Sequence, residues 1–318
     1  MADEGEATTS ISTVHPDVIN THILTRLDGP SLACLSSASS QLHSLSNDES
    51  LWTNICHSTW PSTDHPRMRE IISGFPNGPR SFFSKSFPLL ISSQNSISSS
   101  PSPVELISSV DVHYKETLIF SKVQETETDS GWFRCSPFRI DLLDPKDIVL
   151  TPIESTEDPC KDLLEGLRVS WIIVNPKGRQ AANLSSWKPV SVTRHWLTND
   201  IQVRFATILS VDKETEVQCG ILVSFGIDMQ VKEMSLQVED MDGVNLNGKD
   251  SLGILMRGIE NGERKMGWRE GKLRYEEYLR KMIERKERNL RREGRLDALC
   301  ITIGVSILAC FWMMILST

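Results

Sequence analysis

The chain ends in a run of 19 residues without a charged side chain, Ala298 to Leu316, and two residues follow it. As an α-helix that rises about 1.5 Å per residue, this run is about 28 Å long, close to the roughly 30 Å thickness of a bilayer's hydrocarbon core. Its length predicts a transmembrane tail anchor over residues 296–318. The alternative is an apolar helix that is buried in the chain's own core or in a partner protein.

A basic segment, residues 263–295, precedes this run. Its stretch Arg264–Arg295 has 13 basic and 6 acidic side chains, a balance of +7, although the whole chain carries a net charge of −8. Glu and Lys or Arg at helical spacing predict a long exposed juxtamembrane helix. Positive charge beside a membrane span favours the cytosolic side, so we expect the bulk of the chain to face the cytosol. The endoplasmic reticulum is the expected membrane, and the nuclear envelope is the alternative.

Three short amphipathic helices are predicted within residues 14–60. The first starts at Pro16-Asp17, where Pro fits the first helical position and Asp complements the helix dipole, and runs to Leu27. Asp28-Gly29-Pro30 starts a second helix, and Ser46-Asn47-Asp48 caps a third. The apolar positions on a helical period are Val18, Ile19, Ile23, Leu24, Leu27, Leu32, Leu35, Ala38, Leu51, Trp52, Ile55 and Cys56.

The order of these residues resembles an F-box. The alternative interpretation is a small helical subdomain that packs only on its own protein. The chain departs from the family pattern at Ser39 and Leu42, where Cys and Trp are usual, and at Val14-His15, where Leu usually precedes the Pro. The F-box resemblance is carried by Pro16-Asp17, Ile23-Leu24-x-Arg26-Leu27, Leu32, Leu35, Leu42, Leu45 and Leu51-Trp52. The fuller run, from His15-Pro16-Asp17 through Thr21-His22-Ile23-Leu24-Thr25-Arg26-Leu27-Asp28 to Trp60-Pro61-Ser62, resembles plant F-box proteins with a carboxyl-terminal hydrophobic segment, the cytokinin-induced group.

This resemblance implies a module that docks on a Skp-type adaptor and, through the adaptor, on a cullin. In that family the ubiquitin-transfer chemistry belongs to other subunits, so the chain is expected to be a non-catalytic substrate-recognition subunit. The residues expected to meet the adaptor are Pro16, Asp17, Ile19, Ile23, Leu24, Leu27, Leu32, Leu35, Leu42, Leu51 and Trp52.

Two segments connect this module to the rest of the chain. Residues 61–90 predict a helical extension, with a short helix that ends at Gly74 and an aromatic cluster of Phe82, Phe83 and Phe87 that packs on the module or on the next domain. Residues 91–103 are dominated by serine and predict a flexible linker, because they cannot bury enough apolar surface to offset the entropy of ordering. Residues 1–13 are polar and acidic, and predict a short disordered tail rather than a signal peptide.

A β-rich domain is predicted over residues 104–262, because apolar residues there alternate with polar ones. The clearest case is the run of Val217, Cys219, Ile221, Val223 and Phe225. Repeated one-sided alternation predicts antiparallel strands and a sandwich-like architecture, which makes the whole chain an α+β protein.

The function of this β-rich domain is open between two alternatives. Its run Leu167 to Trp171, with Arg204-Phe205, is similar to the phloem-lectin β-sandwiches behind some plant F-boxes, which would imply a carbohydrate-binding face. The other alternative is a protein-binding sandwich. Four tryptophans are candidates for a recognition surface, although we expect at least half of them in the core. They are Trp132, Trp171, Trp187 and Trp196.

No motif in the sequence predicts catalysis, a metal site or a cofactor. Phosphate-binding, calcium-loop and nucleophile-elbow patterns are absent, and the seven histidines lack zinc-ligand spacing. Cys135, Cys160 and Cys219 are the candidate nucleophiles, and each is better explained as a core or surface residue. Seven scattered cysteines predict a reducing compartment without disulfides. The negative net charge disfavours nucleic acid as a partner.

Together these features predict a membrane-anchored substrate receptor of a Skp–cullin–F-box ubiquitin ligase. Its targets would be ubiquitinated and degraded by the proteasome, and the resemblance suggests a role in the cytokinin response. The substrate protein is expected to be membrane-associated. The alternative is a lectin-like or protein-binding membrane scaffold without a ligase role.

Overall fold

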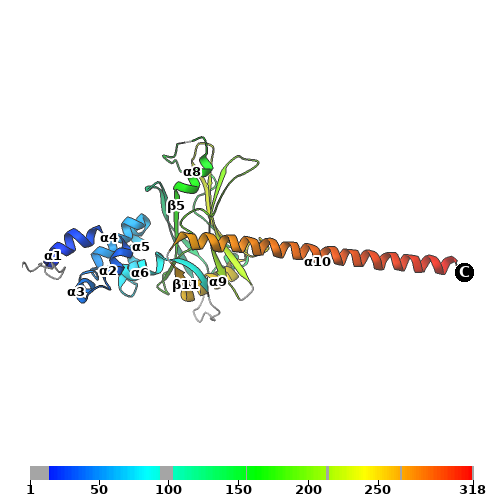
Figure 1. Cartoon of the computed structure of the whole chain (residues 1–318), viewed down its shortest axis with the longest axis horizontal. Coiled ribbons are helices and arrows are strands. Elements are labelled where there is room, and N and C mark those ends of the chain that lie inside the picture. Colours follow the sequence, from blue (N-terminus) through cyan, green and yellow to red (C-terminus); the bar gives the residue numbers. More distant parts are fainter. Residues whose placement is uncertain (1–13, 94–102, 155, 213–214, 266, 317–318) are drawn as a thin grey trace, which may run out of the picture.

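Three parts follow one another along the molecule in the computed structural model: a helical module, a two-sheet domain and a long carboxyl-terminal helix (Figure 1). The structure describes residues 14–93, 103–154, 156–212, 215–265 and 267–316. The predicted tail, residues 1–13, and residues 94–102 of the predicted linker lie outside the described residues. The α+β fold class predicted from the sequence is confirmed.

The amino-terminal part of the helical module contains more helices than the three predicted. Its first helical stretch is α1 (Pro16–Val18), which continues as the π-helical η2 (Ile19–Ile23) and the 3-10 helix η3 (Leu24–Arg26). It is therefore not the regular helix that was predicted. After α2 (Gly29–Leu35), a helix that the sequence analysis missed, α3 (Ser40–Leu45), begins where the Ser39 hydroxyl accepts a hydrogen bond from the Leu42 N–H. The last is α4 (Glu49–Thr59), capped by Asp48 as predicted.

The extension after α4 comprises η4 (Pro61–Asp64), α5 (Pro66–Ser73) and α6 (Gly78–Ser86). Phe83 lies 5.5 Å from Trp52 and 5.2 Å from Trp60 between ring centroids, so the predicted packing of the aromatic cluster on the module is confirmed. The same apolar cluster continues into the neighbouring sheet through Ile107 and Ile172. The helical module, which we define as residues 14–87, therefore shares a core with the β-rich domain.

The β-rich domain contains two sheets. Its six-stranded sheet has the order β11-β1-β6-β5-β2-β3, and its five-stranded sheet has the order β4-β10-β9-β8-β7. All pairings are antiparallel except that of β1 with β6. The strands are β1 (Leu89–Ser93), β2 (Glu105–Tyr114), β3 (Thr117–Glu127), β4 (Arg139–Asp141), β5 (Leu167–Asn175), β6 (Gln180–Asn183), β7 (Ser191–Arg194), β8 (Ile201–Ser210), β9 (Glu216–Phe225), β10 (Val231–Glu239) and β11 (Gly262–Lys265).

The strands form because their alternating apolar residues share one interior. The five apolar residues predicted on one face of β9, from Val217 to Phe225, are all buried in the main core. Trp171 of β5 and Phe205 of β8 are fully buried in the same core. Three helices accompany the sheets: α7 (Gly131–Cys135), α8 (Pro159–Gly166), which packs on β7, and α9 (Gly248–Asn261), which packs on β1 and α7.

Two predicted boundaries are corrected by the pairing of β1 with β11. Residues 89–93 form a strand, although the sequence assigned them to a helical extension and a linker. Residues 262–265 also form a strand, so the basic helix begins after them and not at residue 263. The partly buried Arg264 fixes this strand, because its guanidinium donates to the carbonyls of Lys85, Ala181 and Ile259.

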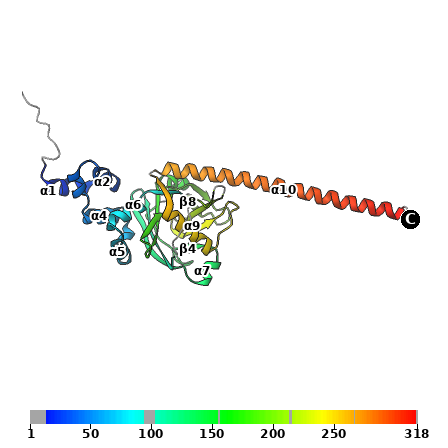
Figure 2. The same cartoon turned by 90° about the horizontal axis from the view of Figure 1, so that it is seen from below.

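The long helix α10 (Trp268–Leu316) joins the basic segment and the apolar run without a break. Its first turns pack on the five-stranded sheet, where Tyr278 is buried and donates to the Asp240 carbonyl at 2.8 Å. It then extends away from the sandwich (Figure 2). Among the described residues, α10 is the one helix long and apolar enough to cross a bilayer. The apolar run of α10, Ala298 to Leu316, is fully exposed. The alternative prediction, that this run is buried in the chain's own core, is therefore wrong.

Candidate functional site

Six of the residues predicted to meet an adaptor form the interior of the helical module. Each of the six is at most 5% exposed, and Trp52 also donates its indole N–H to the Ser46 carbonyl at 2.7 Å. In this conformation they hold the module together and do not reach its surface. They are Ile19, Leu24, Leu32, Leu42, Leu51 and Trp52.

The other five predicted residues lie at the surface of the same helices. Pro16 and Asp17 are exposed at the start of α1, whereas Ile23, Leu27 and Leu35 are half-buried. Val18, which the sequence placed on the apolar stripe, is 45% exposed. Asp28 orders the turn between η3 and α2, because its carboxylate accepts a hydrogen bond from the Ser31 N–H at 2.9 Å. Hydrogen bonds from Ser31 also lower the pKa of Asp28. These helices therefore present apolar side chains on an ordered surface.

A buried carboxylate ties the helical module to the six-stranded sheet. Asp111 of β2 is fully buried and accepts hydrogen bonds from the Ser62 N–H at 2.9 Å and the Ser62 hydroxyl at 2.5 Å. The Ser121 hydroxyl donates to it at 2.7 Å, and Ser62 also contacts the Ser109 hydroxyl at 2.6 Å. Burial raises the pKa of Asp111, and hydrogen bonds from Ser62 and Ser121 oppose that shift. We call this cluster the junction carboxylate. The sequence pattern does not reveal this cluster, because Asp111 occupies a polar position of an alternating strand.

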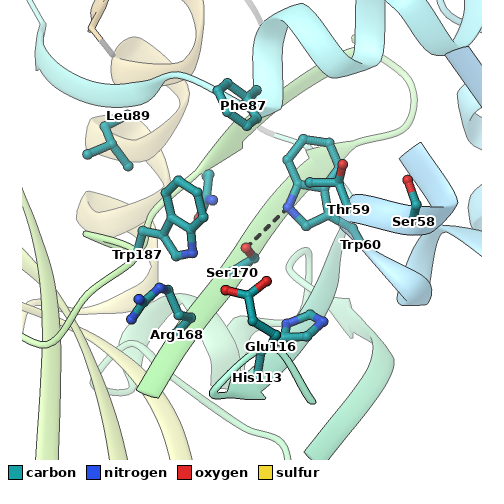
Figure 3. Close-up of a pocket in the computed structure, with 11 residues that line it drawn as sticks. Ser58, Thr59, Trp60, Phe87, Leu89, His113, Glu116, Arg168, Ser170 and Trp187 are labelled. Atoms are coloured by element: carbon teal, nitrogen blue, oxygen red, sulfur yellow. Dashed lines mark hydrogen bonds between the residues drawn. The ribbon is translucent and has the colours of Figure 1, made fainter. Parts of the chain in front are cut away.

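A cavity of about 240 Å³ lies beside this junction (Figure 3). Trp60, at the end of α4, donates its indole N–H to the Ser170 hydroxyl of β5 at 3.1 Å. Phe87 meets Trp187 edge to face at 6.2 Å between centroids. Burial lowers the pKa of His113, although Asp111 and Glu116 oppose the shift. The lining residues are Ser58, Thr59, Trp60, Phe87, Leu89, His113, Glu116, Arg168, Ser170, Asn183 and Trp187.

The backbone of this cavity wall is strained at two non-glycine residues. Glu116 has φ +72° and Trp187 has φ +63°, a region that side chains with a Cβ rarely adopt. The cavity is smaller than the roughly 300–1,000 Å³ of typical small-molecule sites. Its walls combine aromatic rings with a guanidinium, a carboxylate and an imidazole.

Two of the cysteines are buried, which makes their thiols poor nucleophiles. Burial raises the pKa of the Cys56 and Cys219 thiols to about 12, so both remain protonated at neutral pH. Cys135 is exposed and Cys160 is half-buried. No cluster of potential metal ligands occurs among the described residues.

The four candidate tryptophans do not form one recognition surface. Trp171 is fully buried, whereas Trp132, Trp187 and Trp196 are exposed, so the expectation that at least half belong to the core is wrong. Trp187 lies at the junction cavity. Trp132 and Trp196 lie at opposite ends of the five-stranded sheet. Trp132 belongs to α7, which precedes β4, and Arg139 of β4 pairs with Gln237 near the end of β10. The β7–β8 turn that carries Trp196 lies at the beginning of β10, because Ile201 pairs with Phe225, which pairs with Val231.

The helical module defines the class of protein. The sequence profile of the F-box-like family matches residues 16–58, which cover α1 to α4. The chain belongs to the family of plant F-box proteins, because it is similar over nearly its whole length to three proteins of Arabidopsis thaliana. No solved structure matches the chain.

The three relatives are of similar length to this chain. F-box protein At2g27310 is 42% identical over 327 residues, which cover 96% of each chain. Probable F-box protein At2g36090 is 44% identical over 316 residues, which cover 95% of this chain and 94% of the relative. F-box protein At3g44326 is 43% identical over 333 residues, which cover 95% and 90% respectively. Membership of this family implies the role of a substrate receptor in a Skp–cullin–F-box ligase.

Proposed function

We propose that this protein is a membrane-anchored substrate receptor of a Skp–cullin–F-box ubiquitin ligase. The observation that carries the proposal is the F-box match over residues 16–58, on a chain whose α10 ends in an apolar span. In this proposal, residues 14–60 recruit the ligase, residues 104–262 select the target, and residues 263–318 place both at a membrane. The target is ubiquitinated and passed to the proteasome, and the resemblance to the cytokinin-induced group suggests a hormone-responsive setting.

The adaptor contact is proposed on the exposed edge of the helical module. Val18, Ile23 and Leu27 retain accessible apolar surface, and Pro16 and Asp17 lie beside them. Burial of partly exposed apolar side chains is what drives association, at about 25 cal/mol per Å². The six interior residues contribute indirectly, since they hold these helices in place.

Substitution of Ile23 by aspartate is expected to reduce recovery of a Skp-type adaptor by about tenfold or more, since it places a charge in the proposed apolar contact. The measurement is co-purification of the adaptor with the full-length chain. Because Ile23 is half-buried, the thermal unfolding midpoint of each variant is recorded alongside.

The matched control is Asn54→Asp, which introduces the same charge at an exposed position of α4. It is expected to leave adaptor recovery unchanged. If Ile23→Asp and Asn54→Asp recover the adaptor equally well, while both remain folded, the proposed contact edge is wrong. Absence of adaptor from the unaltered chain as well would favour a scaffold without a ligase role.

The membrane arrangement is proposed from the composition of α10. Basic residues near an anionic leaflet each add about 1 kcal/mol of attraction, and positive flanks favour the cytosolic side. The positive flank accounts for the cytosolic side; the endoplasmic reticulum is proposed as the membrane because tail anchors most often go there, with the nuclear envelope as the alternative.

A chain that ends at Arg295 is expected to move from the membrane fraction to the soluble fraction. The full-length protein should resist alkaline carbonate extraction, because a spanning helix is held by its whole apolar length rather than by surface charge. Fractionation followed by immunoblotting measures both forms. Release of the full-length protein at alkaline pH would show peripheral attachment and would exclude the anchor.

A further inference from the structure

Several large apolar side chains are exposed together at one end of the five-stranded sheet. They come from three separate loops, and their exposed fractions range from 54% to 87%. Large apolar patches on a soluble domain mark binding surfaces, and tryptophan is the residue most enriched at the energetic centres of interfaces. We call this set the loop-end patch; it consists of Ile148, Leu150, Trp196, Leu197 and Ile227.

The strand register places the three loops side by side. Arg194 of β7 pairs with Ile201 of β8, which pairs with Phe225 of β9. Phe225 in turn pairs with Val231 of β10, and Val231 bridges to Val149. The β7–β8 turn, the β9–β10 turn and the segment around Val149 therefore share one edge. At about 4.8 Å between strands, this edge is about 20 Å wide, enough for a protein segment to lie across it.

Hydrogen bonds hold each turn of the patch in one conformation. In the β7–β8 turn, the His195 N–H donates to the Asp200 carbonyl at 2.8 Å, and the Asn199 N–H donates to the His195 carbonyl at 2.9 Å. In the β9–β10 turn, the Gly226 N–H donates to the Gln230 carbonyl at 2.9 Å. Trp196, Leu197 and Ile227 are therefore presented at the tips of ordered turns, which lowers the entropy lost on binding.

The three loops are also bonded to one another. Val149 and Val231 exchange backbone hydrogen bonds at 3.0 and 2.9 Å, and the Thr151 hydroxyl donates to the Met229 carbonyl at 2.7 Å. Lys232 forms an ion pair with Asp200 at 2.8 Å, which connects the β9–β10 and β7–β8 regions. The patch is a single platform rather than a set of independent loop tips.

Exposed carboxylates flank the patch, together with the basic side chains of Lys146 and Arg194. Asp147 precedes Ile148 and Asp228 follows Ile227, and both carboxylates are exposed. Residues 144–154 contain three acidic side chains and one basic one. Within the described part of the chain, neither Asp147 nor Asp228 forms an ion pair. A partner that brings Lys or Arg beside its apolar side chains would complement this charge, and a like-charged partner would be repelled.

The position of the patch favours a protein over a membrane as its partner. The helix α8, which follows the Leu150 loop and packs on β7, marks this side of the sandwich in Figure 1. This side projects away from the line that joins the helical module to the carboxyl end of α10. A bilayer crossed by the far end of α10 would lie well away from it, and the exposed carboxylates that flank the patch would be repelled by anionic lipid.

We propose that the loop-end patch docks the target protein, through a target segment that combines large apolar side chains with Lys or Arg. This inference rests on the proposed receptor function and names the surface that selects the target. Trp196 and Leu197 insert between apolar side chains of the segment, and Asp147 and Asp228 pair with its cations.

The test uses the full-length chain in detergent together with its adaptor, and synthetic peptides that combine Leu and Phe with Lys and Arg. The double variant Trp196→Ser, Leu197→Ser is expected to weaken peptide binding by about tenfold or more. Trp132→Ser is the matched control, because this tryptophan is equally exposed at the opposite end of the same sheet, and it should leave binding unchanged. Asp147→Lys with Asp228→Lys should shift the preference toward peptides with Glu in place of Lys and Arg.

Four results would overturn the proposal. The first is equal loss of binding in the Trp132 and Trp196 variants, and the second is equal binding of peptides whose Leu and Phe are replaced by Ser. The third is binding to anionic phospholipid vesicles that the Trp196 variant abolishes, which would assign the patch to lipid. The fourth is a change from dimer to monomer in that variant, which would assign it to a second copy. We expect every patch variant to recover the adaptor normally. If even the unaltered chain fails to recover the adaptor, the proposed receptor function is wrong, and this outcome is distinct from failure of the docking proposal.

Discussion

Replacement of Asp111 by alanine is expected to loosen the junction between the helical module and the six-stranded sheet by about 2–3 kcal/mol, because it leaves buried donors without an acceptor. The Ser62 N–H and the Ser121 hydroxyl would lose their acceptor, whereas the Ser62 hydroxyl would keep its contact with the Ser109 hydroxyl. Hydrogen–deuterium exchange over residues 58–66 is the appropriate measurement, since a chain of several parts lacks a single unfolding free energy. Exchange in this segment should accelerate, and exchange in β9 should not.

The conservative control is Asp111→Asn. Its side-chain oxygen can still accept from Ser62 and Ser121, and its amide can donate to the Ser62 hydroxyl, which then donates to Ser109. The variant keeps an uncharged hydrogen-bonding group at this buried position at every pH, so we expect its local stability at neutral pH to stay within about 1 kcal/mol of the unaltered chain. Accelerated exchange in Asp111→Asn equal to that of Asp111→Ala would show that the hydrogen bonds do not hold the junction.

The pH dependence of this junction has a defined sign. Burial raises the pKa of Asp111, so the folded state holds the proton more tightly than the unfolded state. Its contribution to stability is greatest below the ordinary carboxyl pKa of about 3.9 and falls as the pH rises through the higher folded pKa. The difference in exchange between the unaltered chain and Asp111→Asn should follow this course, since the variant cannot titrate.

Replacement of Trp52 by alanine is expected to cost about 3–5 kcal/mol and to unfold the helical module, since it removes a large buried side chain. Trp52 is 2% exposed and packs on Phe83. Adaptor co-purification should be lost together with the helical circular dichroism of the module. In the Ile23→Asp variant, by contrast, adaptor binding should be lost while the helices persist.

Trp52→Phe provides the control for this substitution. Phenylalanine keeps most of the apolar packing and removes the hydrogen bond to the Ser46 carbonyl, which is worth about 1 kcal/mol. We expect this variant to stay folded and to recover the adaptor. Persistent adaptor recovery in Trp52→Ala would instead mean that the interior of the module is dispensable for docking.

Individual helices and strands were predictable from the sequence where a residue pattern or a capping residue marks them locally. The alternation from Val217 to Phe225 predicted β9, and the cap at Asp48 predicted the start of α4, because both depend on neighbouring residues. The pairing of β1 with β11 joins residues far apart in sequence, so no local sequence pattern predicts it. The serine-rich composition from residue 91 therefore predicted a linker where β1 continues to Ser93.

The candidate site was predictable in part for the same reason. A helical period identifies an apolar stripe, but it does not distinguish a side chain that packs inside the module, such as Leu24, from one that remains at the surface, such as Ile23. The junction carboxylate was not predictable, because the partners of Asp111 come from η4 and β3. Exposure of Trp196 likewise depends on the turn that carries it and not on its sequence neighbours.

The unbroken course of α10 determines the reach of the receptor. Arg285 still fastens the helix to the sandwich, through paired hydrogen bonds of 3.1 and 2.9 Å to Asp242. From there to Ala298 the helix rises about 20 Å at about 1.5 Å per residue. In the proposed arrangement, this helical stretch sets a fixed distance of about 20 Å between the membrane surface and the sandwich. Target segments that extend less than this distance from the same membrane would not reach the sandwich. The receptor would thus choose its targets by height above the bilayer as well as by chemistry.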